Sequence, residues 1–456
     1  MKEKKLPAGA RDKMPFWFSS AWSLRAAAVA TCTLLFGYAT FYATDVLLLN
    51  PTTVGLLLLA SKLFDGFTDL VIGYLVDKTN TRLGKARPYE LAIFALWVFS
   101  FMYYSTPTGI SDTAKYVWIF IMYTMVNSIS ITMLYGNEVA YLNRAVIKHE
   151  NKVKITALNG VYTIIISTVL SIAIPQFVAA AGVDPKGWSF LALAIAVPMT
   201  IIGLSRFFFC KEIQQDSEPV KLDIKEGASV IFKNKYIWIF GIMYFGYHFL
   251  NVLSGTAQTY YFQYEIGDLG FASFVGMGMF LVPFLLAFVP KLMAKFGTRN
   301  VLRAGIILIG FGPLMRMIFG TNPITLIVFS IVFLIGTVPV GFMSTVYVFE
   351  CIDYGAWKTG KRVEAMIGAV NSFVAKVGQA FASAGAGLVM GLAGYNGALE
   401  VQSATTMTAI RGLYNVAPIV VAVIMLIGCH FYDVEKKLPE IRAELAKQQT
   451  EVEQAK

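Results

Sequence analysis

Long apolar stretches recur along the whole chain, separated by short polar segments. Each stretch is close to the ~20 residues that an α-helix needs to cross ~30 Å of hydrocarbon. The short alternating segments that are typical of a membrane β-barrel do not occur. We therefore predict an all-α membrane protein with twelve transmembrane helices. The predicted spans are 20–48, 54–76, 88–107, 114–136, 156–180, 188–210, 236–262, 271–290, 301–319, 323–349, 364–392 and 406–431.

Charged residues are concentrated between these stretches and make up only 14% of the chain, against 56% hydrophobic residues. A soluble domain carries roughly 25% charged residues. Most of the 38 Lys and Arg lie at the two termini and in every second loop, which is the positive-inside pattern for an even number of spans. We therefore predict an integral cell-membrane protein with both termini in the cytoplasm. The same distribution argues against nucleic acid as a partner; membrane lipid is the expected surrounding, and we expect a monomer.

The longest internal polar segment follows the sixth span and divides the chain in two. Six spans, a linker and six more spans form the two-half plan of the major facilitator architecture. The basic loops 73–88 and 289–303 occupy equivalent places in the two halves. We predict an N-terminal half, a cytoplasmic linker, a C-terminal half and a cytoplasmic tail, at 1–210, 211–235, 236–432 and 433–456.

The second span holds the densest set of charges inside the membrane, where an ionised residue costs roughly 2.5–3.5 kcal/mol on insertion scales. Asp65 and Asp69 are four residues apart and share one helix face, with Lys62 one turn earlier. Hard oxygen ligands such as these carboxylates and Thr68 suit a hard cation, and a shared proton would also relieve their repulsion. The pattern predicts a Na⁺ or H⁺ site; a salt bridge of Lys62 with one aspartate is the alternative.

Other spans carry polar residues that could contact a solute or couple it to the cation. Lys376 lies deep in span eleven and needs a partner, for which the carboxylates of span two are the natural choice. Aromatic, amide and hydroxyl groups suit sugar recognition, although packing explains any single one of them. The further candidates for substrate binding or coupling are Arg25, Glu138, Tyr38, Asn127, His248 and Asn251.

Charged residues near the predicted cytoplasmic ends of the spans are candidates for a gate. Asp353 and Arg362 follow span ten, and Asp77 and Arg82 follow span two. An ordinary interfacial ion network is an equally good explanation of their pattern.

The sequence contains no phosphate-binding loop, no nucleophile elbow and no metal-protease motif. Its four cysteines are scattered without metal or disulfide spacing. We therefore expect no enzyme activity, no cofactor, and no metal beyond Na⁺ as a coupling ion.

Three segments carry a family resemblance: KLFDGFTDLVIGYLVDKTNTRLGKARPY (62–89), DYGAWKTGKR (353–362) and FVAKVGQAFASAGAGLVMGLAGY (373–395). They resemble the glycoside-pentoside-hexuronide cation symporters, the melibiose permease family of the major facilitator superfamily. The resemblance implies a cation site on span two, with Asp65 and Asp69 matching the paired aspartates of that family. It also implies that Lys376 takes part in coupling.

The resemblance assigns further residues and shows departures. Thr68 stands where melibiose permease has an asparagine ligand, Thr132 lies near a threonine of the cation site, and Ser372 matches a hydroxyl near the sugar. The carboxylates that grip sugar hydroxyls in melibiose permease are replaced by Val29 and Gly136. Melibiose itself is therefore not the expected substrate.

These patterns predict a secondary transporter that moves a sugar, glycoside or hexuronide together with a cation by alternating access. Arg25 and Lys376 would favour a substrate with an anionic group, unless Arg25 pairs with Asp45 or Glu138. A lysolipid or other amphipathic solute is the alternative cargo on the same fold. A non-transporting membrane receptor is the alternative of another class, although the loops are too short for an effector domain.

Overall fold

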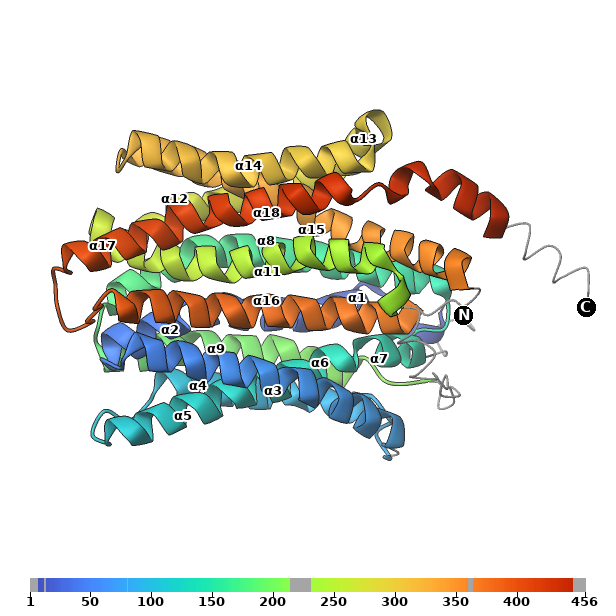
Figure 1. Cartoon of the computed structure of the whole chain (residues 1–456). Helices are drawn as coiled ribbons and strands as arrows, with labels where there is room; N and C mark the ends of the chain where they lie inside the picture. The colour runs from blue at the N-terminus through green and yellow to red at the C-terminus, as the bar shows by residue number, and fades with distance from the viewer. Residues whose placement is uncertain (1–6, 12–13, 80, 214–230, 360–363, 446–456) are drawn as a thin grey trace, which may run out of the picture. The chain divides into compact units, whose positions relative to one another are not determined.

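The computed structural model describes residues 7–11, 14–79, 81–213, 231–359 and 364–445, and these are helical almost throughout (Figure 1). The first sequence half contains α1 (Phe16–Phe36), α2 (Ala39–Phe41), η3 (Tyr42–Val46), α3 (Pro51–Lys78), η4 (Arg87–Leu91), α4 (Ala92–Tyr104), α5 (Asp112–Thr124), η5 (Met125–Ser130), α6 (Ile131–Gly136), α7 (Glu138–Ala145), α8 (His149–Ala181) and α9 (Pro185–Phe209). The second contains α11 (Lys235–Tyr261), η6 (Phe262–Ile266), η7 (Leu269–Phe271), α12 (Ala272–Gly276), η8 (Met277–Leu281), α13 (Val282–Phe296), α14 (Thr298–Phe319), α15 (Pro323–Thr359), α16 (Glu364–Leu392), α17 (Ala404–Arg411), η9 (Gly412–Val416) and α18 (Ala417–Phe431).

The membrane-spanning character predicted from the sequence is confirmed. In the described ranges, nine helices are long and apolar enough to cross a membrane, and the number is ten if the pair Phe16–Phe36 and Ala39–Val46, bent by 43°, is counted as one span. The predicted second and third spans, at α3 and α4, are not among them. Lys62, Asp65 and Asp69 interrupt the apolar run of α3, and α4 has only 13 residues. The number twelve therefore stays a prediction.

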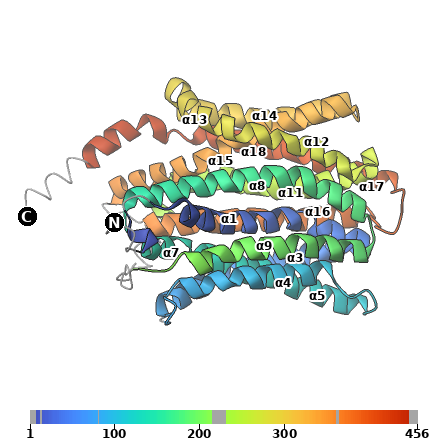
Figure 2. The ribbon, with the colours of Figure 1, turned by 180° about the vertical axis from the view of Figure 1, so that it is seen from behind.

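The first of two compact units comprises Met1–Pro219, Gln258–Met277 and Ser383–Ala409. Within it α1 packs between α8 and α9, as Figure 2 shows, and α3 packs against α5 and η5. The unit includes the ends of α11 and α16 that we predict to be external, so its bounds differ from those of the sequence half 1–210. These two ends pack with the helices of the first half.

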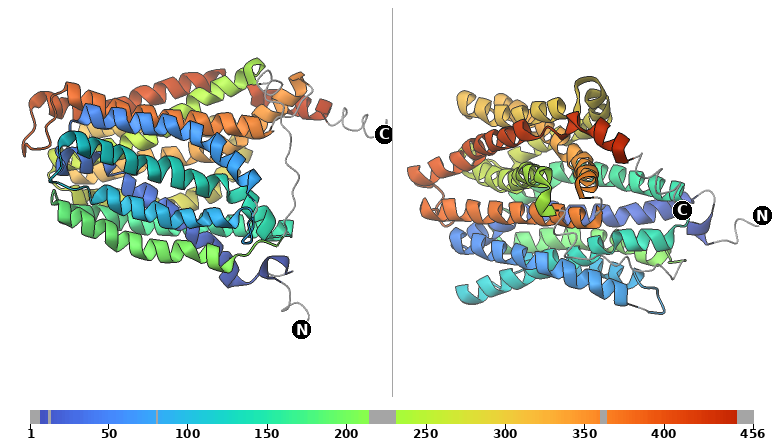
Figure 3. Two further views of the ribbon diagram at one scale, coloured as in Figure 1. Left: turned by 90° about the horizontal axis from the view of Figure 1, so that it is seen from below. Right: turned by 45° about the vertical axis from the view of Figure 1, so that its right-hand side comes forward.

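The second unit comprises Val220–Ala257, Gly278–Ala382 and Ile410–Lys456. Its helix α14 lies alongside α15 and α18, and α14 and α18 are the gold and red helices in the right-hand view of Figure 3. Glycines allow close approach here, because a Cβ on Gly336 would lie 2.6 Å from the Gly305 carbonyl oxygen. Each unit is thus a helical bundle with its own packed interior.

One kind of contact recurs within both units. Glu212, just after α9, accepts hydrogen bonds from the backbone N–H groups of Ala86 (2.8 Å) and Arg87 (2.5 Å). Glu435, just after α18, accepts from those of Thr298 (2.8 Å) and Arg299 (2.9 Å). In each unit a carboxylate therefore satisfies backbone donors at the start of a helix, where the helix dipole also favours negative charge.

The beginning of the C-terminal tail is packed against the second unit. Val434, Leu438 and Ile441 are buried in the hydrophobic core of the second unit. Arg442 donates to the Asp353 carboxylate at the end of α15 (3.0 Å). The apolar residues of the tail recur at helical spacing, and this signal outweighs its overall polarity.

Candidate functional site

Asp65 lies at the centre of a buried polar group in the first unit. The Thr132 hydroxyl donates to Asp65 Oδ1 (2.7 Å), which joins α3 to α6. The Thr68 hydroxyl contacts the carbonyl oxygens of Asp65 (3.0 Å) and Ser128 (2.6 Å). Asp65, Thr68 and Thr132 are all less than 10% exposed. The structure thus brings together three of the four residues that we predicted for the cation site.

Further hydrogen bonds from hydroxyl groups connect α3 to the predicted fourth span next to this site. The Ser128 hydroxyl donates to the Ser61 carbonyl oxygen (2.9 Å), and that of Thr124 donates to the Ser61 hydroxyl (2.9 Å). Ser128 lies in η5, a π-helical segment, and such segments are frequent at functional sites. The sequence pattern did not indicate the π-helix, because an inserted residue leaves an apolar span almost unchanged.

Lys62 lies one turn before Asp65 and is half-buried. Its Nζ donates to Asn127 Oδ1 in η5 (3.3 Å) and lies 5.9 Å from the centroid of the Tyr123 ring. The lysine and the carboxylate therefore both contact the predicted fourth span, but through different residues. Asn127, predicted as a substrate ligand, is engaged here as the partner of Lys62.

Three predicted residues cannot be placed. The side chains of Asp69 and Asp77 lie outside what the structure describes, although both are part of α3. Arg362 lies outside the described residues altogether. Their roles in cation binding and gating stay predictions.

Arg25 lies in a buried network with Glu90, Glu138 and Arg206. Its Nε donates to Glu90 (3.1 Å) and its Nη2 to Glu138. Arg206 pairs with the same two carboxylates, at 3.5 Å from Glu90 and 2.5 Å from Glu138, and its guanidinium lies 3.9 Å from the centroid of the Trp22 ring.

Two guanidinium groups thus face two carboxylates, and the formal charges of the network balance. Arg25, Arg206 and the Glu90 side chain have no exposed surface. Ion pairing within this network is sufficient to account for Arg25 and Glu138, and no substrate is needed to explain them. Their assignment to substrate binding stays a prediction, and the ion pairs argue against it; the sequence had offered the Arg25–Glu138 pair as the alternative.

A second polar group lies between α11 and α16 in the second unit. Gln379 Nε2 lies 3.3 Å from His248 Nδ1, and the rings of Tyr244 and Tyr247 meet the imidazole edge-on. The two helices approach closely, since a Cβ on Gly378 would lie 2.8 Å from the Phe245 carbonyl oxygen. Lys376 is three residues before Gln379 and shares its helix face.

The His248 contact is satisfied by one imidazole tautomer. With the Gln379 amide nitrogen as the donor, Nδ1 accepts and the ring proton is on Nε2. That Nε2 atom is buried and has no hydrogen-bond partner among the described residues. A buried donor without a partner is costly, roughly 1–3 kcal/mol, so the site offers a hydrogen bond to a ligand. Gln379 was not among our sequence candidates, because one more glutamine in an apolar helix carries no distinguishing pattern.

The remaining predicted residues belong to both units. Asn251 is exposed and its Nδ2 donates to the Tyr247 carbonyl oxygen of its own helix (2.8 Å). Ser372 is exposed and Tyr38 is half-buried. Of the predicted gate, Arg82 is exposed, and Asp353 is paired with Arg442.

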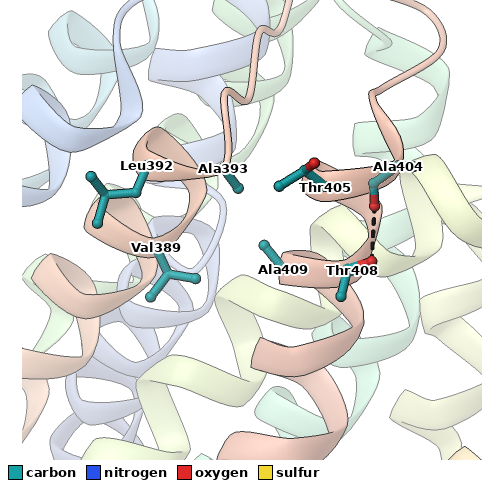
Figure 4. A pocket seen from close by; sticks show the side chains of 7 residues that line it. All are labelled: Val389, Leu392, Ala393, Ala404, Thr405, Thr408 and Ala409. Carbon is teal, nitrogen blue, oxygen red and sulfur yellow. Dashed lines mark hydrogen bonds between the residues drawn. The ribbon is translucent and has the colours of Figure 1, made fainter.

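A hollow of about 680 Å³ lies between the end of α16 and α17 (Figure 4). Val389, Leu392, Ala393, Ala404, Ala409 and two threonines line it, and the Thr408 hydroxyl is bonded to the Ala404 carbonyl oxygen of its own helix (2.9 Å). This apolar lining contains none of the predicted site residues. Among the described residues, no group of three or more His, Cys, Asp or Glu side chains could hold a metal ion.

Comparison with known proteins decides the family. The profile of the MFS/sugar transport protein family matches residues 22–436, nearly the whole chain. The chain belongs to this family. The family resemblance predicted from the sequence is therefore confirmed, as is the prediction that this is a membrane transporter and not an enzyme.

Several named relatives are similar over most of their length. The isoprimeverose transporter of Lactiplantibacillus pentosus is 30% identical over 90% of this chain and 86% of its own. The putative sulfoquinovose importer of Escherichia coli is 26% identical over 92% of this chain and 90% of its own. The glucuronide carrier protein homolog of Escherichia coli is 23% identical, with 89% of each chain covered.

Solved structures confirm the major facilitator fold of this family member. A D-xylose-proton symporter superposes with a TM-score of 0.63, covering 90% of this chain and 97% of its own, at 13% identity. The nucleoside transporter NupG superposes with a TM-score of 0.62, covering 91% of this chain and 99% of its own, at 11% identity. At such identities the likeness concerns the fold alone.

Proposed function

We propose that this protein is a symporter that uses a Na⁺ or H⁺ gradient to accumulate a sugar or glycoside by alternating access. The observation that carries the proposal is the buried Asp65 carboxylate of α3, the predicted second span, which accepts a hydrogen bond from the Thr132 hydroxyl. A buried carboxylate in a transmembrane segment is costly and is typical of ion and proton pathways.

The groups around Asp65 suit a small hard cation. Carboxylate, hydroxyl and backbone carbonyl oxygens, from Asp65, Thr68, Thr132 and Ser128, converge in the contact between α3 and the η5–α6 segment. Such oxygen donors favour Na⁺ over softer metals. With H⁺ as the coupling ion, Asp65 itself is the group that takes up the proton.

Cation binding would then change the balance of charges on α3. Neutralising Asp65 removes a negative charge one helical turn from Lys62 on the same helix. Coupling of two sites is reciprocal, so the cation must raise sugar affinity by the factor with which the sugar raises cation affinity. The partner role predicted for Lys376 belongs to the same proposal.

For the sugar we propose His248 and Gln379 as recognition groups. Sugars are rich in oxygen acceptors, and the buried His248 Nε2–H has no hydrogen-bond partner among the described residues. The aromatic rings of Tyr244 and Tyr247 beside it suit the apolar faces of a pyranose ring. Relatives named for the transport of isoprimeverose and sulfoquinovose support a sugar-like substrate. Sulfoquinovose is an anionic sugar.

Counterflow in proteoliposomes tests this function directly. Vesicles preloaded with unlabelled isoprimeverose, sulfoquinovose or a glucuronide are diluted into labelled sugar, with and without Na⁺ and at two pH values. We expect transient accumulation of at least one sugar, stimulated by Na⁺ or by low pH. Counterflow that changes neither with Na⁺ nor with pH would contradict the cation coupling. A lack of counterflow with every sugar would contradict the substrate class.

A further inference from the structure

Asp45 is a buried carboxylate in the first unit that the proposed transport site does not use. It lies in the π-helical segment η3, at the end of the bent first span that we predict to be external. Only 3% of its surface is exposed. Burying a charged group is costly unless hydrogen bonds satisfy it. The role of Asp45 is therefore inferred from its hydrogen-bond partners.

Three hydroxyl groups from three segments surround this carboxylate. Tyr264 and Tyr395 both donate to Asp45 Oδ1, at 2.5 and 2.6 Å, and Thr44 donates to Oδ2 at 2.6 Å. The two tyrosine hydroxyls lie 3.0 Å apart. Tyr264 belongs to η6, at the end of α11, and Tyr395 follows the end of α16. One carboxylate therefore joins the ends of three predicted spans.

Neighbouring contacts reinforce this connection. The hydroxyls of Thr44 and Tyr260 lie 2.7 Å apart, and Tyr260 is almost fully buried. Gly397 lies against the backbone of Thr44 so closely that a Cβ at this position would collide with the Thr44 carbonyl oxygen. The three segments are thus held by side-chain hydrogen bonds and by direct backbone packing.

We propose that Asp45, Tyr264 and Tyr395 form a latch that holds the external ends of the first, seventh and eleventh predicted spans together. Hydrogen bonds to a charged acceptor are among the strong ones in proteins. Opening of the external side by alternating access requires these bonds to break, and water then replaces the tyrosine hydroxyls around Asp45. The latch sets how often the external side opens.

Cysteine accessibility tests the latch without measuring transport. Thr40 is 5% exposed and lies one helical turn before Thr44, so Thr40→Cys reports on this contact. The four native cysteines are buried, and the protein without Thr40→Cys gives the background. Intact cells are treated with a membrane-impermeant maleimide, and labelling is normalised to the amount of protein in the membrane.

We expect labelling of Thr40→Cys to rise about tenfold when Tyr264→Phe and Tyr395→Phe are combined, because two bonds to a charged acceptor are lost. Gly397→Ala should have the same effect by a steric route. Tyr162→Phe is the matched control, since it removes one hydroxyl contact with Ser20 elsewhere in the same unit (2.8 Å) and should leave labelling unchanged.

The outcomes separate the latch from the proposed function. Raised labelling in both the double variant and Gly397→Ala supports the latch even if no sugar is transported. Unchanged labelling in both would overturn it, whatever the transport assays give. An equal rise with Tyr162→Phe would also overturn it, because the effect would then be general loosening.

Discussion

At the scale of single residues, Asp65 accepts a hydrogen bond from Thr132 of α6, and the Thr68 hydroxyl contacts the Ser128 carbonyl oxygen of η5. Asp65 and Thr68 could be placed on one face of a helix because their spacing is helical. Thr132 was assigned only through the family resemblance, since residues on two helices are brought together by tertiary packing. The Gln379 contact with His248 and the Ser128 carbonyl could not be predicted, because neither has a sequence pattern.

The Thr132 hydroxyl provides a first prediction at this scale. Thr132→Val removes the donor to Asp65 and should weaken cation binding about tenfold or more, as expected for a hydrogen bond to a charged group. The measurement is the cation concentration that gives half-maximal stimulation of uptake. Thr124→Val is the control, because the Thr124 hydroxyl donates to the Ser61 hydroxyl between the same two predicted spans and is not bonded to Asp65. Equal effects of the two variants would contradict the site.

His248 and Asn251 provide a second prediction, because the structure separates two residues that the sequence treated alike. His248→Phe removes a buried donor and should raise the KM for sugar about tenfold or more. Asn251→Ala should change it less than about twofold, since that amide bonds its own helix and is exposed. Initial uptake rates over a range of sugar concentrations measure both. A larger effect of Asn251→Ala than of His248→Phe would refute the assignment.

At the scale of helices, the apolar pattern located the elements well and their irregularities poorly. The predicted span 364–392 coincides with α16, and 114–136 corresponds to α5, η5 and α6 together. Four π-helical segments, η3, η5, η6 and η9, were not predicted. A π-helical segment differs from an α-helix by one residue, and an all-apolar span has no periodicity that would show this. Two of these segments carry Asp45 and Tyr264.

The buried ion network gives a prediction about helix packing. Arg206 connects α9 to Glu90 in η4 and to Glu138 in α7. Arg206→Gln leaves the carboxylates of Glu90 and Glu138 with Arg25 as their one guanidinium in the network, so a buried negative charge is no longer balanced. This variant should lower the free energy of unfolding by about 3–5 kcal/mol. Arg442→Gln breaks the pair with Asp353, in which the arginine side chain is 59% exposed, and should cost less than about 1 kcal/mol.

Thermal unfolding of the purified protein in detergent measures the stability of Arg206→Gln and Arg442→Gln. A loss of stability with Arg206→Gln and normal sugar affinity in the remaining folded protein would support a structural role for the network. If Arg206→Gln or Arg25→Gln left stability unchanged but abolished binding of anionic sugars, the original substrate-binding assignment of Arg25 would be restored.

At the scale of the whole molecule, composition and charge alternation were sufficient for the class of protein. A chain with 14% charged residues and basic loops at alternate positions has few alternatives to a polytopic helical membrane protein. The family profile and the solved structures confirm the major facilitator fold. The compact units could not be predicted, because 258–277 and 383–409 pack with the first sequence half through contacts that no local pattern encodes.

The central claim is that a cation bound on α3 drives accumulation of the sugar, and gradient-driven uptake tests it most directly. Proteoliposomes with an imposed inward Na⁺ or H⁺ gradient should accumulate the transported sugar above its external concentration. Asp65→Cys and Asp69→Cys should abolish accumulation, because a thiol replaces a carboxylate of the proposed site. Exchange of sugar without a gradient controls for folding. Full cation-driven accumulation in either variant would contradict the account.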